Sequence, residues 1–521
     1  MAGIDALQFD DRFVRTLPGD PKLDNRPRQV LGAAYTPTTP TPVPAPTLVA
    51  LVPEVAALLG LDATPGAGLV DVLAGNRVVT GMAPYAACYG GHQFGTWAGQ
   101  LGDGRAITLG EVVDAGGETF ELQLKGAGPT PYSRRADGRA VLRSSVRELV
   151  CSEAMHHLGV PTTRALSLVT TGAPVLRDLL YDGHPAEEPG AIVCRVAPSF
   201  LRFGSYEIHT ARDDHATLRR LVRFTLERWF PRCIAGDALD VPAFFAEVAS
   251  TTAWMVAEWL RVGFVHGVMN TDNMSILGLT IDYGPYGWLE PFDPDWTPNI
   301  TDASGRRYRF GNQAQVAHWN IAQLARALVP LVEPAGVAAM QVTLEAFPRV
   351  LAAHHRHTSL RKLGLHAAHA SDDAILEGMS DVLGASGVEL DMTLFFRALA
   401  EPLAGVGPIR RAYYGDPPHA HLVQLDAWLA AYAARVRAEG IDDAERARRM
   451  NAVNPLYVPR NYLVQEVIEA TERGDGGAAL AVLMDVLRQP YTEQAGRAHF
   501  AGKRPEWARD KPGCSMLSCS S

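Results

Sequence analysis

The sequence predicts an α+β protein built from two lobes, and three observations support this prediction. Residues 83–204 contain short, glycine-punctuated segments with strand periodicity and one clear helix. From Leu218 onward, apolar residues recur at helical spacing. The third observation is the polar loop in residues 264–273, which is followed nine residues later by Asp282. A loop and an acidic residue in this order are typical of the catalytic end of a protein-kinase-like fold.

Length and composition are those of an ordinary globular protein with more than one compact core. The 521 residues are 47% hydrophobic and 20% charged, and no apolar run approaches the roughly 20 residues that span a bilayer. A formal net charge of -9 argues against a broad nucleic-acid-binding surface. Asp5, Asp10 and Asp11 argue against a secretory or transit peptide. We therefore expect a cytoplasmic protein that binds neither membranes nor nucleic acids.

Changes in composition divide the chain into four expected regions. Residues 1–80 form an N-terminal extension with a proline-rich strap at residues 36–46. Residues 81–215 form a kinase-like N-terminal lobe that carries the phosphate-binding residues. Residues 216–330 form the catalytic and metal-binding core of the second lobe. Residues 331–521 form a helical C-terminal extension that ends in a cysteine-containing tail.

Local patterns predict the elements that surround the candidate site. Strict alternation predicts a strand at residues 120–125. Apolar stripes predict helices at residues 141–157 and 246–262, and a proline in the first turn predicts another at residues 53–61. The apolar segment 275–281 resembles a strand, which would place the following carboxylate at the edge of a cleft rather than in a core.

Lys125 and Glu148 match the ion pair with which kinases hold phosphate groups. Lys125 ends the predicted strand, and Glu148 lies 23 positions later on the predicted helix. The alternative is an unrelated strand lysine and a solvated helix glutamate. Taken alone, the pair does not decide between these two interpretations.

Asn273 and Asp282 supply the oxygen ligands that a hard divalent cation prefers, although each also fits an ordinary Asx turn. The spacing differs from that of a kinase, whose catalytic base lies five positions before the metal-binding asparagine. That position is Val268 here, and valine cannot accept a proton. Either the base has moved or the chemistry has changed.

Two tight turns are candidates for phosphate binding. Gly102, Gly104 and Arg105 share the first turn, whose backbone amides and cation can approach a phosphate. Asp137 and Gly138 form the second. Because such turns are common in hairpins, an ordinary hairpin is the alternative for both.

Arg195 and Arg202 lie among apolar residues and therefore need an anionic partner. A phosphate group that accepts two parallel hydrogen bonds is one such partner, and a buried Asp or Glu is the other. Together with Lys125 and Arg105, they form more positive charge than a kinase usually gathers around its phosphates. The pocket is therefore suited to a heavily charged leaving group.

Long strings of residues, in order along most of the chain, connect these features to a known family. They are Tyr89-Gly-Gly-His-Gln-Phe-Gly95, Gln100-Leu-Gly-Asp-Gly-Arg105, Gln123-Leu-Lys-Gly-Ala-Gly-Pro-Thr-Pro-Tyr-Ser-Arg134, Asp137-Gly-Arg139, Arg143-Ser-Ser-Val-Arg-Glu148, His266-Gly-Val-Met-Asn-Thr-Asp-Asn273, Ile281-Asp-Tyr-Gly-Pro-Tyr286, Trp319-Asn320, Asn454-Pro-Leu-Tyr-Val-Pro-Arg-Asn-Tyr462 and the final Cys519-Ser-Ser. The sequence resembles the selenoprotein O (SelO/YdiU) pseudokinases. Residues 331–450 contribute least to the resemblance.

The resemblance implies an enzyme that transfers AMP from ATP to Ser, Thr or Tyr side chains of proteins with Mg²⁺ or Mn²⁺. UMP transfer from UTP is a further activity of this class. The nucleotide would lie end for end relative to a kinase, so that the α-phosphate meets the metal and the acceptor. By motif, the nucleotide would contact Gly102, Gly104, Arg105, Lys125, Asp137, Gly138, Arg195, Arg202 and Asp282, the metal would bind Asn273 and Asp282, and Asp272 would accept the proton.

This implied chemistry accounts for the unusual spacing. AMP transfer needs attack at the α-phosphorus and releases pyrophosphate, so the base need not occupy the kinase position. Asp272, next to a metal ligand, can orient or deprotonate the incoming hydroxyl. Lys125, Arg195 and Arg202 would offset the charge that builds on pyrophosphate. Glu148 would orient Lys125 rather than react.

The tail raises the question of redox chemistry. Family members with selenocysteine place it third from the C-terminus, where this chain has Cys519. Cys514 and Cys519 lie in a short polar tail in which nothing obvious would bury them. The tail cannot form a disulfide with the loop between Asp282 and Trp319, because that loop contains no cysteine. The simplest remaining pair is Cys514 with Cys519.

Two other functions stay open at this stage. The first is a true kinase that acts on proteins or small molecules, with Asp272 as a displaced base. The second is a non-catalytic, redox-regulated nucleotide-binding module. The label that reaches the acceptor separates the first from AMP transfer, and nucleotide binding without any modification would indicate the second.

Overall fold

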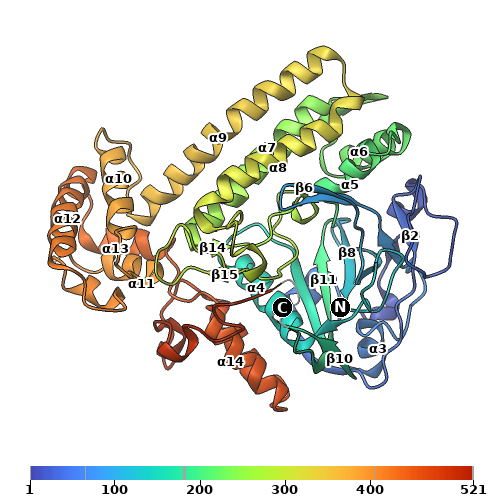
Figure 1. Cartoon of the computed structure of the whole chain (residues 1–521), viewed down its shortest axis with the longest axis horizontal. Coiled ribbons are helices and arrows are strands. Elements are labelled where there is room, and N and C mark those ends of the chain that lie inside the picture. The colour runs from blue at the N-terminus through green and yellow to red at the C-terminus, as the bar shows by residue number, and fades with distance from the viewer. Residues whose placement is uncertain (1, 65, 180–182, 404, 519–521) are drawn as a thin grey trace.

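A nine-stranded antiparallel sheet forms the centre of the N-terminal half of the protein (Figure 1). The computed structural model describes residues 2–64, 66–179, 183–403 and 405–518. The strand order is β2-β4-β7-β8-β11-β10-β3, with β1 paired to β7 and β9 paired to β11. The strands are β1 (Phe9–Asp10), β2 (Tyr35–Pro37), β3 (Thr47–Leu51), β4 (Tyr85–Ala87), β7 (Ala106–Val113), β8 (Thr119–Lys125), β9 (Ala140–Val141), β10 (Arg164–Arg177) and β11 (Ala186–Ala197).

Helix α4 packs against β10 and β11, and two helices from the end of the chain pack on α4 in turn. Apolar side chains of these strands and helices form one continuous core. The C-terminal extension therefore returns to the N-terminal sheet. The helices of this part are α1 (Arg12–Thr16), α2 (Pro53–Leu58), α3 (Ala67–Leu73), α4 (Leu142–His157), α14 (Asn461–Glu472) and α15 (Ala478–Leu487).

The rest of the described chain is mainly helical and has two cores of its own. The first lies around α7 and includes α5, α6, α8 and part of α9. The second core is formed by α10, α11, α12 and α13 at the end of the molecule opposite the sheet (Figure 1). These helices are α5 (Phe203–Thr210), α6 (His215–Trp229), α7 (Val241–Val262), α8 (Gln313–Leu328), α9 (Pro334–Lys362), α10 (Asp372–Leu383), α11 (Met392–Leu399), α12 (His419–Glu439) and α13 (Asp443–Asn451).

Three two-stranded antiparallel sheets lie outside the large sheet. They are β5 (Gly90–Gln93) with β6 (Thr96–Gln100), β12 (Ile234–Ala235) with β13 (Ala238–Leu239), and β14 (Phe264–Val265) with β15 (Gly287–Trp288). The first hairpin packs on α5 and on the short 3₁₀ helix η3 (Thr271–Asn273). This contact brings residues 90–93 beside the polar loop that the sequence singled out.

Most of the predicted elements around the site are confirmed. The strand at residues 120–125 is β8, and the helices at residues 141–157 and 246–262 are α4 and the larger part of α7. The helix expected at residues 53–61 is α2, which begins at Pro53 as expected but ends at Leu58, earlier than predicted. In a chain with an N-terminal half built on a sheet and a second half built on helices, the α+β class also holds.

The strand expected at residues 275–281 is wrong. Met274 and Thr280 form an isolated antiparallel bridge, and the chain reverses between them. Gly278 adopts a positive φ of 66°, and an added Cβ there would lie 2.8 Å from Thr251. The apolar side chains of this segment fill the core around α7 instead of a sheet, so periodicity alone could not separate the two outcomes.

The polar tail is also buried, contrary to expectation. Cys514 is only 4% exposed and packs with Tyr462, Leu463 and Ala508. Burial raises the pKa of the Cys514 thiol to about 12, which disfavours the reactive thiolate. Cys519 lies outside the described residues, so its pairing with Cys514 stays a prediction. None of the described helices is both long and apolar enough to cross a bilayer.

Glu121 on β8 is a buried carboxyl group that gives the sheet a pH dependence. It lies opposite Glu111 of β7, accepts hydrogen bonds from the Phe200 amide (3.3 Å) and the Tyr85 hydroxyl (3.4 Å), and is 5% exposed. Burial, and next the Glu111 carboxylate, raise the pKa of Glu121 to about 8, while Arg228 opposes the shift. The folded state therefore holds a proton that the unfolded state releases near its ordinary pKa.

We expect Glu121→Gln to remove this pH dependence. In the natural protein the free energy of unfolding falls as the pH rises from about 4.5 to about 8, because over this range the folded state holds a proton that the unfolded state has already released. The stability advantage of the variant should grow by roughly 2–4 kcal/mol between pH 5 and pH 8, measured by urea denaturation. The exposed Glu118→Gln is the control. An identical pH slope for Glu121→Gln and the natural protein would contradict this assignment.

Candidate active site

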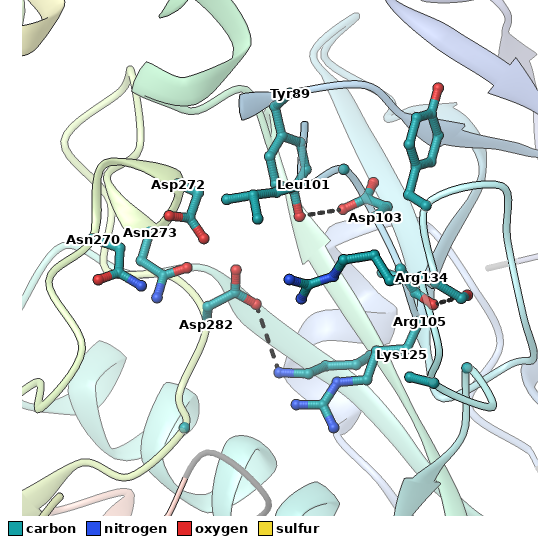
Figure 2. Close-up of a pocket in the computed structure, with 18 of the residues that line it drawn as sticks. Tyr89, Leu101, Asp103, Arg105, Lys125, Arg134, Asn270, Asp272, Asn273 and Asp282 are labelled. Carbon is teal, nitrogen blue, oxygen red and sulfur yellow. Dashed lines mark hydrogen bonds and ion pairs between the residues drawn. The ribbon is translucent and has the colours of Figure 1, made fainter. Parts of the chain in front are cut away.

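A cleft of about 650 Å³ lies between the turns of the sheet and the loop before Asp282 (Figure 2). It brings together most of the residues that the sequence assigned to one site. Those that line it are Gly102, Gly104, Arg105, Lys125, Asp137, Gly138, Arg195, Asp272, Asn273 and Asp282. Glu148 and Arg202 are buried behind this lining, where they contact its charged side chains.

Lys125 lies at the base of the cleft and joins the sheet to α4. Its ammonium group is 2.6 Å from a carboxylate oxygen of Glu148 and 3.6 Å from one of Asp282. Both β8 and α4 are packed in the same core, so the backbone fixes this pairing. The structure therefore contains the ion pair between Lys125 and Glu148 that the 23-residue spacing predicted.

Asp282 is held by two buried arginines. Arg195 approaches one carboxylate oxygen at 2.6 Å and Arg202 the other at 2.5 Å. Burial by itself would raise the pKa of Asp282, but the charges of Arg202 and Arg195 outweigh it and hold this pKa well below its ordinary value. Of the two partners that the sequence left open for these arginines, the buried carboxylate is the one that the structure shows.

The backbone of Asp282 is strained. Its φ is 56°, in the left-handed region that residues other than glycine rarely occupy. Such a conformation persists only where the surroundings impose it, and it is concentrated at functional sites. His266 contributes by contacting the Ile281 carbonyl through its ring nitrogen at 3.0 Å.

Asn273 and Asp282 lie side by side at the cleft (Figure 2). The Asn273 amide nitrogen donates to the Val268 carbonyl at 3.0 Å, which leaves its side-chain oxygen as an acceptor. One amide oxygen and one ionised carboxylate are oxygen donors of the kind that a hard divalent cation prefers. The described residues contain no cluster of three His, Cys, Asp or Glu side chains suited to a metal.

Asp272 lies next to Asn273 and is 8% exposed. Its Oδ2 accepts a hydrogen bond from Gln93 at 3.3 Å, while its Oδ1 has no partner among the described residues. Burial raises the pKa of Asp272 to about 7, against the lowering effect of Arg202. A carboxylate with one free oxygen at a cleft is able to accept a proton from a ligand.

Strand β5 (Gly90–Gln93) packs so closely on its neighbours that two contacting positions require glycine. An added Cβ at Gly91 would lie 2.8 Å from Oδ1 of Asp272, and one at Gly204 would lie 2.1 Å from the Gly90 carbonyl. The His92 amide also donates to the Thr271 hydroxyl at 2.7 Å. The hairpin thus sets the position of Asp272.

We expect Gly91→Ala to displace Asp272 and to lower turnover by about 10- to 100-fold, because small misplacements of reacting groups have effects of this size. Nucleotide affinity should change by less than about twofold, since the phosphate side of the cleft is untouched. Single-turnover kinetics and equilibrium binding together measure the two quantities. Gly407→Ala, where nothing lies within 4 Å of the added carbon, is the control. Normal turnover in Gly91→Ala would mean that the position of Asp272 is unimportant.

The two tight turns are packed against neighbouring segments. A Cβ at Gly102 would lie 2.4 Å from Tyr132, and one at Gly138, where φ is 70°, would lie 2.2 Å from the Gly128 carbonyl. Asp137 receives two hydrogen bonds of 2.8 Å from Arg177. The turns therefore form a fixed rim on the sheet side of the cleft.

Several lining residues were not singled out from the sequence. Asp103 is 3% exposed and accepts hydrogen bonds from the Ala87 amide and the Tyr89 hydroxyl. Asn270 accepts from Tyr308 at 2.6 Å, which no local pattern reveals because the partner lies 38 positions away. Asp103 lies between Gly102 and Gly104, and its place in this turn could have marked it as a residue of the site.

The C-terminal tail contacts a segment that holds the polar loop before Asp272. The Leu517 amide donates to the Pro298 carbonyl at 3.0 Å, and the Ile300 amide donates to the Leu517 carbonyl at 2.8 Å. Between them, the side chain of Asn299 donates to the Gly267 carbonyl at 3.0 Å. The tail, the segment at 298–300 and the loop before Asp272 are thus linked in one chain of contacts.

Comparison with known proteins decides the family. The profile of the family described as protein adenylyltransferase SelO matches residues 23–488. The chain belongs to this family. A protein nucleotidyltransferase YdiU of Azoarcus sp. (strain BH72) is 58% identical over 522 residues, covering 99% of both chains. Proteins of the same name from Xanthomonas axonopodis pv. citri and Nitrosospira multiformis are 55% and 54% identical, over 99% of this chain and 99% and 96% of theirs.

The resemblance noted from the motifs is thereby confirmed. Membership in the SelO family makes the chain an enzyme of the nucleotidyltransferase class, with a nucleoside triphosphate as a substrate. The strings at residues 89–95, 100–105 and 266–273, which carried the resemblance, are the same segments that meet at the cleft.

Proposed function

We propose that this protein transfers AMP from ATP to Ser, Thr or Tyr side chains of other proteins and releases pyrophosphate. The proposal includes Mg²⁺ or Mn²⁺ at Asn273 and Asp282, and a two-lobed, kinase-like arrangement around the cleft. UTP is a second nucleotide that the same phosphate contacts would accept. Family membership supports the class of reaction, and the roles of individual residues rest on the geometry of the cleft.

The observation that carries the proposal is the position of Asp272. The kinase base position is occupied by Val268, whereas Asp272 stands next to the proposed metal ligand Asn273 with one free carboxylate oxygen. The basic side chains Lys125 and Arg195 lie across the cleft from it. A base at one side and cations at the other suit an attack on the α-phosphorus with a charged leaving group on the sheet side.

The chain's own residues divide the reaction between them. Asp272 accepts the proton of the incoming hydroxyl, whose oxygen forms a bond to the α-phosphorus as the bond to the bridging oxygen of pyrophosphate breaks. Lys125 and Arg195 stabilise the charge that develops on pyrophosphate, and Glu148 holds Lys125 in place. A divalent cation at Asn273 and Asp282 would neutralise phosphate charge and orient the α-phosphate.

Arg202 contacts two of the proposed functional residues from behind the lining of the cleft. It donates to the Asp272 carbonyl at 2.8 Å and to Asp282 at 2.5 Å. It therefore couples the proposed base to the proposed metal ligand. Contact between Arg202 and the nucleotide stays a prediction that requires this pairing to open.

Transfer of label separates this proposal from its competitors. Purified protein and acceptor proteins are incubated with Mg²⁺ and ATP labelled at either the α- or the γ-phosphate. AMP transfer predicts label in protein from the α-phosphate alone. Label from the γ-phosphate alone would indicate a kinase, and ATP binding with no label in protein would indicate a nucleotide-binding module.

A further inference from the structure

Several arginines of the cleft have no partner of opposite charge among the described residues, and Arg105 and Arg134 are two of them. The side chains of Arg105 and Arg134 make no hydrogen bond or ion pair with any residue in the described part of the chain. By contrast, Lys125, Arg177 and Arg195 each pair with a carboxylate. Figure 2 shows both free side chains extending into the cleft on either side of Lys125.

The turn that carries Arg134 is fixed in a strained conformation. The φ of Arg134 is 56°, which is costly for a residue with a side chain. The turn is held to the first glycine turn, because Thr130 donates to the Asp103 carbonyl at 2.6 Å and Ser133 donates to the Gly104 carbonyl. The strain and these bonds fix the base of the Arg134 side chain at the rim of the cleft.

The lining of the cleft carries more positive than negative side chains. Lys125 and Arg195 are already paired with Glu148 and Asp282, whereas Arg105 and Arg134 add two cations that have no carboxylate partner among the described residues. An anion with several adjacent charges satisfies all these groups at once, and a guanidinium binds two phosphate oxygens through its paired N–H groups.

We infer that Arg134 is a further nucleotide-positioning residue, which binds the terminal phosphates of the nucleotide and the pyrophosphate that leaves. This inference rests on the proposed function, because it places the terminal phosphates on the sheet side of the cleft. Arg134 and Arg105 then hold the leaving group from two sides while Lys125 contacts it from the base. Nucleotides without terminal phosphates gain nothing from Arg134.

Equilibrium binding tests the inference without turnover. The ligands are the α,β-methylene analogue of ATP, which cannot lose pyrophosphate, inorganic pyrophosphate and AMP, each titrated with Mg²⁺ into the natural protein and Arg134→Ala. We expect the affinity for the ATP analogue and for pyrophosphate to fall about tenfold or more, since charge-assisted hydrogen bonds are lost. The affinity for AMP should stay within about twofold. Arg134→Lys should restore part of the loss, because it keeps the charge without the paired donors.

Two controls make the result decisive. Arg232→Ala removes the same charge at a side chain that is 84% exposed and outside the cleft lining, and it should change none of the three affinities. Equal affinities in Arg134→Ala and the natural protein would overturn the inference, as would an equal loss for all three ligands, which indicates a damaged turn. Failure of the proposed function is distinguishable, because it appears in the label experiment on the natural protein.

Discussion

Asp282→Asn is expected to reduce AMP transfer by about 10²- to 10³-fold, the range observed when one preorganised electrostatic contact to a transition state is lost. The substitution keeps the size of the side chain but removes the charge that the proposed metal needs. It also leaves Arg195 and Arg202 without their shared counter-ion, although both are buried. Transfer is measured as label from the α-phosphate of ATP reaching protein.

Loss of stability must be separated from loss of chemistry in this variant. Removing one partner from a buried ion pair typically lowers the free energy of unfolding by about 3–5 kcal/mol, so assays belong at a temperature where both proteins are folded. Asp295→Asn, which removes an exposed carboxylate paired with Arg309, is the matched control and should retain full activity. If Asp282→Asn transfers AMP at a near-normal rate, the metal assignment is wrong.

Lys125→Ala is expected to lower transfer by a similar factor, about 10²- to 10³-fold, because it removes a buried cation from the base of the phosphate site. Lys125→Arg should not restore activity. The space between Glu148 and Asp282 accommodates a compact ammonium group, and the guanidinium of Arg195 already contacts both carboxylates. Steady-state kinetics with ATP as the varied substrate measure the effect.

Glu148→Gln sharpens this test. If Glu148 acts by orienting Lys125, the double variant Lys125→Ala/Glu148→Gln should be about as active as Lys125→Ala alone, because the effects of residues that act as a unit are not additive. The exposed Lys22→Ala controls for loss of one positive charge. Fully multiplicative losses would show that Glu148 acts independently of Lys125.

Local patterns were sufficient to predict the parts of the site that depend on short-range geometry. The strand that ends at Lys125 and the helix that carries Glu148 each follow from periodicity, and the two come together as expected. The Asn273 and Asp282 pair follows from the order of polar residues after a buried helix. For the strand and the helix, the residues on each element share a period that the sequence displays.

Contacts between distant segments were not predictable in the same way. Arg202 and Asp282 are 80 positions apart, and the sequence could not say whether phosphate or carboxylate would satisfy the arginine. Segment 275–281 has the composition of a strand, yet Gly278 reverses it into the helical core. Cys514 looked exposed in a polar tail, but Tyr462 and Leu463 from α14 cover it. Burial of this kind depends on tertiary packing rather than on local pattern.

The central claim is that the acceptor hydroxyl attacks the α-phosphorus of ATP, so that AMP rather than phosphate is transferred. Mass spectrometry of acceptor proteins incubated with the purified enzyme, ATP and Mg²⁺ tests it most directly, with Asp282→Asn as the inactive control. We predict an adduct of AMP on Ser, Thr or Tyr that is absent in the control. A phosphate adduct in its place would contradict the proposed chemistry.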